Sequence, residues 1–374
     1  MGFVPFAMER WQSLHEHDVD LNLSDSGVHP LSLREFLTEE EFEAVLDLRL
    51  IYTQSNGTPE LCEQIATLYD GASGAQVQVT NGGAEANLVS LWALLEPGDE
   101  VVLQIPNYMQ PWGIVRSLGY ETRDWEMVPD FEAATWRFDL DDLARQVNEK
   151  TKLICICNPN NPTGACLGAD VLDAIAEIAR GSGAWVLSDE SYRDSEHSGV
   201  RTATMWGRGE KVLVTNGLSK TFGLPGLRLG WILAPTDLLE ETWARHDYTT
   251  ISPGAISDFA ASIALRPDRR KALLARTRQL LARNYASVTT WLEQNGGVFR
   301  FIPPQAGAML YLRYDLDVPS LELAERLRTE QSVLVVPGAH FGMENWLRIG
   351  FGSETRTVEE GLSRIQTLVK SYPR

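Results

Sequence analysis

A lysine and an arginine share one glycine-rich turn, and together they could do chemistry on a small ligand. The turn covers residues 216–231, and Arg228 follows Lys220 by eight positions. A lysine amine can form a Schiff base with an aldehyde, and an arginine guanidinium can hold a phosphate through a bidentate fork. A ligand that carries both an aldehyde and a phosphate would satisfy both side chains.

Two other segments combine a strand end with residues suited to binding. An apolar strand ending at Thr80 leads through Gly82 and Gly83 into a helix that begins at about Glu85. Free backbone N–H groups at such a helix start can bind an anion. The segment 158–164 reads NPNNPTG. Its prolines and asparagines predict a rigid turn at a strand end that presents one amide outward.

The order of these segments resembles the fold-type I pyridoxal 5'-phosphate (PLP) enzymes, the aspartate aminotransferase family of class I/II aminotransferases. The resemblance extends from about Tyr52 to Gly350 and implies PLP as the cofactor. It gives Lys220 two roles, holding the resting cofactor as an internal aldimine and then carrying protons. It implies that the phosphate is held by these residues: Gly83, Ala84, Ser219 and Arg228.

The resemblance also implies which residues contact the pyridine ring. Tyr108 matches the aromatic residue that stacks on the ring and is expected to take part in catalysis. Asp189 matches the carboxylate that faces the ring nitrogen and keeps it protonated, which makes the ring an electron sink. Asn161 and Tyr192 match the two residues that contact the phenolic oxygen.

The C-terminal segments resemble the family's PG…FG…RI pattern, from Pro337 to Ile349. Arg348 matches the arginine that binds the substrate α-carboxylate, with Asn161 nearby, so the substrate is expected to be an α-amino acid. Tyr52 matches a tyrosine that reaches the cofactor phosphate of a neighbouring subunit, and residues 249–252 are expected to face that subunit's site. The resemblance therefore implies a homodimer with shared active sites.

Two features depart from the common pattern. Gly217 stands where many family members have a phosphate-binding serine, and Ser219 or Asn216 is expected to compensate. The Ser26-Gly27-Val28-His29 string is similar to a PLP subgroup that includes capreomycidine synthase and arginine-oxidising enzymes. His29 is therefore a candidate second acid/base or substrate contact, with a structural turn residue as the alternative.

The resemblance implies a PLP enzyme acting at Cα of an α-amino acid, and an aminotransferase that yields a 2-oxo acid is the preferred interpretation. The alternative is elimination, replacement, cyclisation or oxidation of an amino acid, with arginine or S-adenosylmethionine as conceivable precursors. A PLP-sensing regulator is not favoured, because it would need a DNA-binding domain before Tyr52 and the chain is acidic. A nicotinamide dehydrogenase is not favoured either, because it would need a G-x-G-x-x-G turn, which the run from Gly82 to Glu85 does not supply.

Short apolar runs and amphipathic stretches must position these residues. The runs 101–103, 153–157, 185–187 and 212–214 read as buried strands, and stretches such as 170–180 read as helices between them. This alternation predicts an α/β fold with a mostly parallel sheet in three layers. We expect a PLP-binding large domain over residues 46–266. A smaller α+β domain would combine 1–45 with 267–374, with a long helix over about 268–293.

Composition narrows the possible partners. The 374 residues carry a net charge of -18, which argues against nucleic acid and anionic membranes. No apolar run is long enough to span a bilayer, and the N-terminus lacks the features of a signal peptide, so a cytoplasmic location is expected. The cysteines are interpreted as core thiols, and no metal site is predicted.

Overall fold

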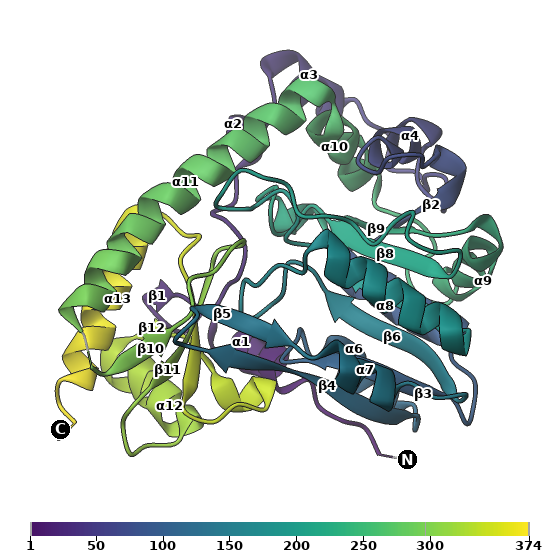
Figure 1. Cartoon of the computed structure of the whole chain (residues 1–374). Coiled ribbons are helices and arrows are strands. Elements are labelled where there is room, and N and C mark those ends of the chain that lie inside the picture. The colour runs from purple at the N-terminus through teal and green to yellow at the C-terminus, as the bar shows by residue number, and fades with distance from the viewer. Residues whose placement is uncertain (1, 296, 373–374) are drawn as a thin grey trace.

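The computed structural model describes residues 2–295 and 297–372, and in this part of the chain two sheets are joined by a long helix (Figure 1). The larger sheet has eight strands in the order β2-β9-β8-β7-β6-β3-β4-β5. Their bounds are β2 (Val77–Thr80), β3 (Glu100–Ile105), β4 (Glu121–Asp130), β5 (Thr135–Phe138), β6 (Thr151–Cys157), β7 (Trp185–Asp189), β8 (Val212–Gly217) and β9 (Gly230–Leu233). The four strands predicted from apolar runs are β3, β6, β7 and β8.

Strand direction brings the ends of five strands to one edge of the large sheet. Strands β4, β3, β6, β7 and β8 are parallel, and β9 is antiparallel to both β8 and β2. Strand β2 therefore runs in the same direction as β8. The loops that follow β2, β3, β6, β7 and β8 all leave from the same edge, which is where active sites of α/β sheets are built.

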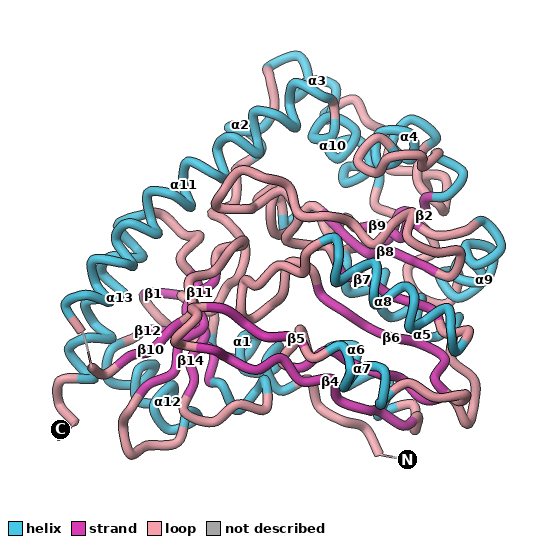
Figure 2. Tube along the Cα trace, viewed as in Figure 1, coloured by secondary structure: helices cyan, strands magenta, loops and turns pink. Residues whose placement is uncertain are grey.

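Alternate residues of each strand enter two separate cores, which makes the large sheet the middle of three layers. Leu153 and Cys155 pack into one core, whereas Ile154 and Ile156 pack into the other. The same alternation separates Leu187 from its neighbours on β7. Helices α7 and α8 lie over one face of this sheet (Figure 2). This arrangement agrees with the predicted α/β fold class.

The helices follow the connections between strands. Those in the described part of the chain are α1 (Ala7–His15), α2 (Leu33–Phe36), α3 (Glu39–Leu46), α4 (Pro59–Ala66), α5 (Gly83–Leu94), α6 (Gln110–Ser117), α7 (Leu140–Gln146), α8 (Ala169–Ser182), α9 (Thr236–His246), α10 (Ala255–Leu265), α11 (Pro267–Gln294), α12 (Ser320–Gln331) and α13 (Thr355–Val369). Helix α11 runs along the molecule from the large sheet to the smaller one (Figure 1). Among the described residues, no helix is long and apolar enough to cross a membrane.

The smaller sheet is antiparallel and has the order β10-β11-β14-β13. Its strands are β10 (Phe299–Phe301), β11 (Met309–Tyr314), β13 (Val336–Pro337) and β14 (Trp346–Gly350), while β1 (Leu21–Asn22) and β12 (Val333–Leu334) form a separate parallel pair. An aromatic cluster connects the two sheets. The rings of Tyr311 and Trp346 lie 4.8 Å apart, and the Trp136 ring of β5 lies 5.5 Å from Trp346.

The N-terminal residues contact both sheets. Strand β1 pairs with β12 beside the small sheet, but Phe36 and Leu37 pack in the core of the large sheet. The predicted division into 46–266 and 1–45 plus 267–374 remains a prediction, and these two contacts show that residues 1–45 do not pack as one unit.

Candidate active site

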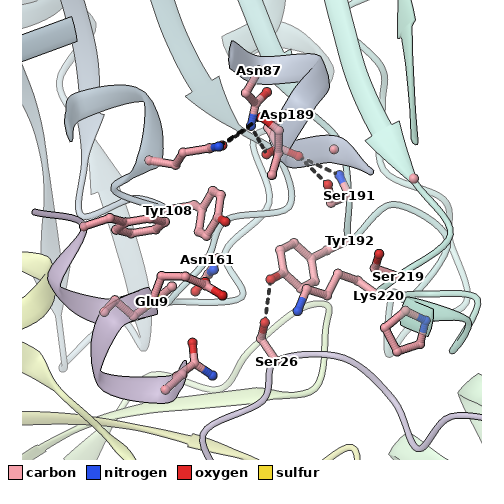
Figure 3. Close-up of a pocket in the computed structure, with 18 of the residues that line it drawn as sticks. Glu9, Ser26, Asn87, Tyr108, Asn161, Asp189, Ser191, Tyr192, Ser219 and Lys220 are labelled. Atoms are coloured by element: carbon pink, nitrogen blue, oxygen red, sulfur yellow. Dashed lines mark hydrogen bonds between the residues drawn. The ribbon is translucent and has the colours of Figure 1, made fainter. Parts of the chain in front are cut away.

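A cavity of about 420 Å³ lies at the shared edge of the large sheet (Figure 3). It brings together most of the residues singled out from the sequence. The predicted residues that line it are Gly83, Ala84, Tyr108, Asn161, Asp189, Tyr192, Ser219, Lys220 and Arg228. They come from loops after five different strands, so only the fold makes them neighbours.

Lys220 follows β8 and presents its amine to this cavity. The Nζ atom lies 3.2 Å from Oδ1 of Asp25, and about a third of the lysine side chain (31%) stays accessible to water. An accessible amine on a buried loop can react with a small carbonyl compound, whereas an amine in a closed core could not.

Asp189 ends β7 and is buried beside the cavity. Its Oδ1 accepts hydrogen bonds from the Ser191 N–H (3.0 Å) and hydroxyl (2.6 Å), and its Oδ2 accepts one from Asn87 Nδ2 (3.3 Å). Burial raises the pKa of the Asp189 carboxyl, and the hydrogen bonds and the Lys220 charge only partly oppose this rise. A cation placed next to Asp189 would remove this penalty, and a protonated ring nitrogen is such a cation.

A close approach of glycines forms the anion-binding end of the cavity. Helix α5 begins at Gly83, and Gly82 before it adopts a φ of 89°, a conformation that favours glycine. A Cβ on Gly82 would lie 2.4 Å from a terminal nitrogen of Arg228. The free N–H groups at the helix start and the guanidinium therefore share one small space, which fits a phosphate.

The departure at Gly217 has a steric reason. A Cβ there would lie 2.8 Å from the carbonyl oxygen of Leu229, so a serine does not fit without moving the backbone. Ser219 lines the cavity and accepts a hydrogen bond of 3.2 Å from Arg228 Nη1, and its role as a compensating hydroxyl remains a prediction. Asn216 instead uses its side-chain oxygen to accept from the N–H of Gly217.

Arg348 lies in β14 and is almost fully buried (1% exposed), next to the cavity but not among the residues that line it. Its Nη1 donates to Asn161 Oδ1 at 2.8 Å, and its Nη2 donates to the carbonyl of Ser24 at 2.6 Å. The Nε atom has no hydrogen-bond partner, and within the described ranges no carboxylate lies at ion-pair distance from Arg348. A buried guanidinium in this state can still bind a carboxylate.

Two tyrosines form the walls between these groups. The hydroxyl of Tyr192 shares a hydrogen bond of 2.8 Å with Ser26, and the Tyr108 ring packs edge-on against Phe6 at 5.2 Å. Burial raises the pKa of both phenols, so both remain protonated and can donate.

Two predicted residues lie away from the cavity. His29 points to Glu354, with 3.4 Å between Nε2 and Oε1, and does not line the cavity. Tyr52 is 81% exposed on the surface. Within one chain, neither His29 nor Tyr52 lines the cavity with the other predicted site residues.

The sequence did not single out the residues in and just before α1 that reach this cavity. Phe6, Glu9 and Gln12 reach the cavity from α1 and the residue before it, and Ser26 reaches it from the loop after β1. No local motif marks the residues of α1, because a short amphipathic helix has the same pattern wherever it packs, whereas Ser26 belongs to the string already noted in the sequence. In the described parts of the chain, no group of His, Cys, Asp and Glu is placed to hold a metal ion.

The cavity combines an amine, a buried carboxylate and an anion-binding helix start. A ligand that fits must offer a carbonyl to Lys220, a cationic nitrogen to Asp189 and an anion to Arg228 and the start of α5. PLP has these three groups in one molecule, so the residues present fit this cofactor. Fold and cavity thus define a PLP-dependent enzyme of fold type I.

Known proteins agree with this conclusion. The family described as aminotransferase class I and II matches residues 32–365. Capreomycidine synthase from Streptomyces vinaceus is 30% identical over 98% of this chain and 94% of its own length. An aspartate aminotransferase from Streptomyces avermitilis is 31% identical over 85% of this chain and 81% of its own length. A PLP-dependent aminotransferase structure from Streptococcus suis is 31% identical and superposes over all of both chains with a TM-score of 0.93.

The chain therefore belongs to the class I and II aminotransferase family, and PLP is its cofactor. Its relatives include enzymes named for amino transfer and one named for the synthesis of capreomycidine.

The glycine cradle leads to a prediction about Gly230, which pairs with Gly217 across β9 and β8. A Cβ at Gly230 would lie 2.5 Å from the backbone of Gly82 and Gly83, which a side-chain shift cannot relieve. We expect Gly230→Ala to destabilise the protein by about 1–3 kcal/mol, the usual cost of overpacking, and to weaken PLP retention. Thermal unfolding with and without added PLP measures both effects.

Gly226→Ala is the matched control, because a Cβ at Gly226 meets no atom within 4 Å. A Gly230→Ala protein that unfolds at the control's temperature would contradict the steric account.

Proposed function

We propose that this enzyme is an aminotransferase that converts an α-amino acid to the corresponding 2-oxo acid. One observation carries the proposal: the Lys220 amine and the Asp189 carboxylate open to the same cavity, and the buried guanidinium of Arg348 lies beside it. The bound cofactor supplies an electron-accepting ring for the electron pair left at Cα.

Lys220 is the residue that moves the proton. Its amine is accessible in the cavity, and a free amine at this place can accept the proton from Cα and deliver it to a neighbouring carbon. The low-dielectric surroundings on the Asp189 side strengthen the attraction between that carboxylate and a cationic ring. Asp189 therefore orients the ring and stabilises its charged form.

Arg348 is the proposed binding group for the α-carboxylate. Asn161 and the Ser24 carbonyl fix the guanidinium plane, and its Nε–H is left for another acceptor. A carboxylate that reached Arg348 would gain a charge-assisted hydrogen bond and would give a buried cation its counter-charge. This contact would place the amino group and Cα of the substrate toward Lys220.

A second candidate function is elimination, replacement, cyclisation or oxidation of a basic amino acid. Glu9 favours it, because this carboxylate approaches the cavity from α1 (Figure 3) and has no ion-pair partner in the described part of the chain. A guanidinium or ammonium on the substrate side chain would pair with Glu9. The similarity to capreomycidine synthase, whose name does not describe amino transfer, points the same way.

We also propose that the enzyme is a homodimer. Large apolar side chains are exposed on the loops around residues 47–58 and 246–258: Leu50 (79%), Ile51 (67%), Tyr52 (81%) and Tyr248 (81%). The loops are adjacent, because Thr53 donates to the carbonyl of Pro253 at 3.0 Å. A patch of this kind is typical of an interface, and a second copy of the chain would bring its own Tyr52 toward this cavity.

The products of the reaction distinguish the two functions. Holoenzyme is mixed with single amino acids, including basic ones, with and without oxygen, and products and cofactor are identified by mass spectrometry. For an aminotransferase we expect a 2-oxo acid and pyridoxamine phosphate in equal amounts. Product formed while PLP stays unchanged would instead support the second function. Lys220→Ala is the control and should give no product, because the proton carrier is gone.

Asp189→Asn tests the role of the buried carboxylate. The amide keeps the size of the side chain but cannot supply the negative charge, so we expect the rate to fall about 100-fold or more, as for other lost electrostatic contacts in active sites. Single-turnover kinetics with a good substrate measure the effect. Asp173→Asn makes the same change on the surface of α8 and should retain the rate. An unchanged rate in Asp189→Asn would refute the proposed role.

Charged substitutions in the apolar patch test the dimer. Ile51→Asp together with Tyr248→Asp would bury two carboxylates in the proposed interface, and we expect the mass in solution to fall from twice 41.7 kDa to 41.7 kDa. Light scattering after size-exclusion chromatography measures this mass. Leu321→Asp changes a side chain that is 44% exposed on α12 and should leave the dimer intact. A wild-type protein that is already monomeric would contradict the proposal.

A further inference from the structure

The carboxylate of Asp25 is held against the Lys220 amine by the loop after β1. Its Oδ1 lies 3.2 Å from Lys220 Nζ and also accepts the N–H of Gly27 at 2.9 Å. The second contact is a local turn that fixes the orientation of the carboxylate on its own backbone. The Asp25 carboxylate is therefore oriented before the pair forms, and only the lysine side chain has to be ordered to make the contact.

The residues on either side of Asp25 are fixed by other parts of the site. The Ser24 carbonyl accepts a hydrogen bond from Arg348, and the Ser26 hydroxyl shares one with Tyr192. The loop also packs directly on the small sheet, because a Cβ on Gly350 would lie 1.9 Å from the Asp25 carbonyl oxygen. Backbone contact of this kind leaves little room for the loop to shift, so the carboxylate stays where the amine is.

The charges around this pair favour an ionised Asp25. Partial desolvation alone would raise the pKa of Asp25, but the Lys220 charge, the Gly27 N–H and the charge of Arg348 outweigh it and lower this pKa to about 2. The other charged or titratable side chains that line the cavity with Lys220 are Glu9, Tyr108, Asp189, Tyr192 and Arg228. Asp25 is the carboxylate in direct contact with Nζ.

We infer that Asp25 is a further active-site residue, which controls the protonation of the Lys220 nitrogen through their direct contact. The inference rests on the proposed role of Lys220 as the amine that reacts and carries the proton. A fixed anion at 3.2 Å stabilises the protonated nitrogen relative to the same site without that charge. The Asp25 carboxylate also orients the Lys220 amine when the amine has no other hydrogen-bond partner.

The partial exposure of the pair sets the size of the expected effect. Water reaches 49% of the Asp25 side chain, so screening reduces the attraction below that of a closed pair. We expect removal of the charge to lower the midpoint for protonation of the Lys220 nitrogen by about one pH unit, the lower end of shifts caused by an adjacent opposite charge.

The first test uses the holoenzyme. The absorbance of PLP attached to Lys220 depends on whether the lysine nitrogen carries a proton, so a pH titration of the spectrum gives the midpoint directly. We expect a midpoint about one pH unit lower in Asp25→Asn than in the wild type. Asp25→Glu should recover part of the shift, because it restores the charge. A midpoint in Asp25→Asn equal to that of the wild type would overturn the inference.

Asp20→Asn is the matched control. It removes the same charge from the same N-terminal segment, but its carboxylate pairs with Arg364 at 2.9 Å and not with Lys220. Its midpoint should equal that of the wild type. A shift as large as that of Asp25→Asn would show that net charge, and not contact, controls the lysine, and would also overturn the inference.

A second measurement separates failure of this inference from failure of the proposed function. If the full-length protein shows no absorbance from bound PLP, the proposed function fails. The pH dependence of Lys220 acetylation by acetic anhydride, followed by peptide mass spectrometry, still tests the pair, because only the unprotonated amine reacts. Asp25→Asn should then be acetylated at a pH about one unit lower than the wild type. Identical profiles would overturn the inference.

Discussion

The direction of five strands is the constraint on which the site depends. Because β2, β3, β6, β7 and β8 run the same way, the residues that follow them meet at one edge of the sheet. Each loop contributes a different group, such as the amine after β8 or the carboxylate at the end of β7. Glycines at the first position of β9 and the last position of β8 let the backbone of this edge approach the Gly82–Gly83 turn closely. The cradle at the start of α5 thus depends on packing within the sheet.

The site holds two charged groups under conditions that cost stability in an isolated protein. Asp189 is buried with a raised pKa, and Arg348 is buried with a free Nε and, in the described residues, no carboxylate at ion-pair distance. Burying such charges is unfavourable unless an opposite charge compensates them. Under the proposed function, a cationic ring at Asp189 and a carboxylate at Arg348 would reduce both penalties. The structure is therefore preorganised for two binding events, and strained groups of this kind are typical of functional sites.

The N-terminal segment adds residues without a family motif to a site otherwise built from residues that match the family motifs. Helix α1 contributes Glu9 to the cavity, and the loop after β1 brings Asp25 to Lys220. The lysine, the aspartate and the arginines suit every reaction that begins with proton removal at Cα. Family members named for different products can share these residues, and their differences must arise where the substrate side chain and the later proton transfers are controlled. In this protein, the N-terminal segment lines the cavity with Phe6, Met8, Glu9, Gln12 and Ser26, and we propose it as the place of such control.

Neighbouring residues along the chain were sufficient to predict the fold class, the cofactor and the residues with local motifs. The strands at 153–157 and 185–187, the turn at 158–164 and the lysine loop are each specified by neighbouring residues, so pattern and resemblance were sufficient for them. Which distant residues share the cavity became known from the packing of the folded chain. Glu9 and Asp25 have no motif, since their roles depend on how α1 and the loop after β1 pack against strands more than 150 residues away. The surface position of Tyr52 and the contact of His29 with Glu354 were likewise set by packing, because a side chain's neighbours across the fold are not encoded by its neighbours in sequence.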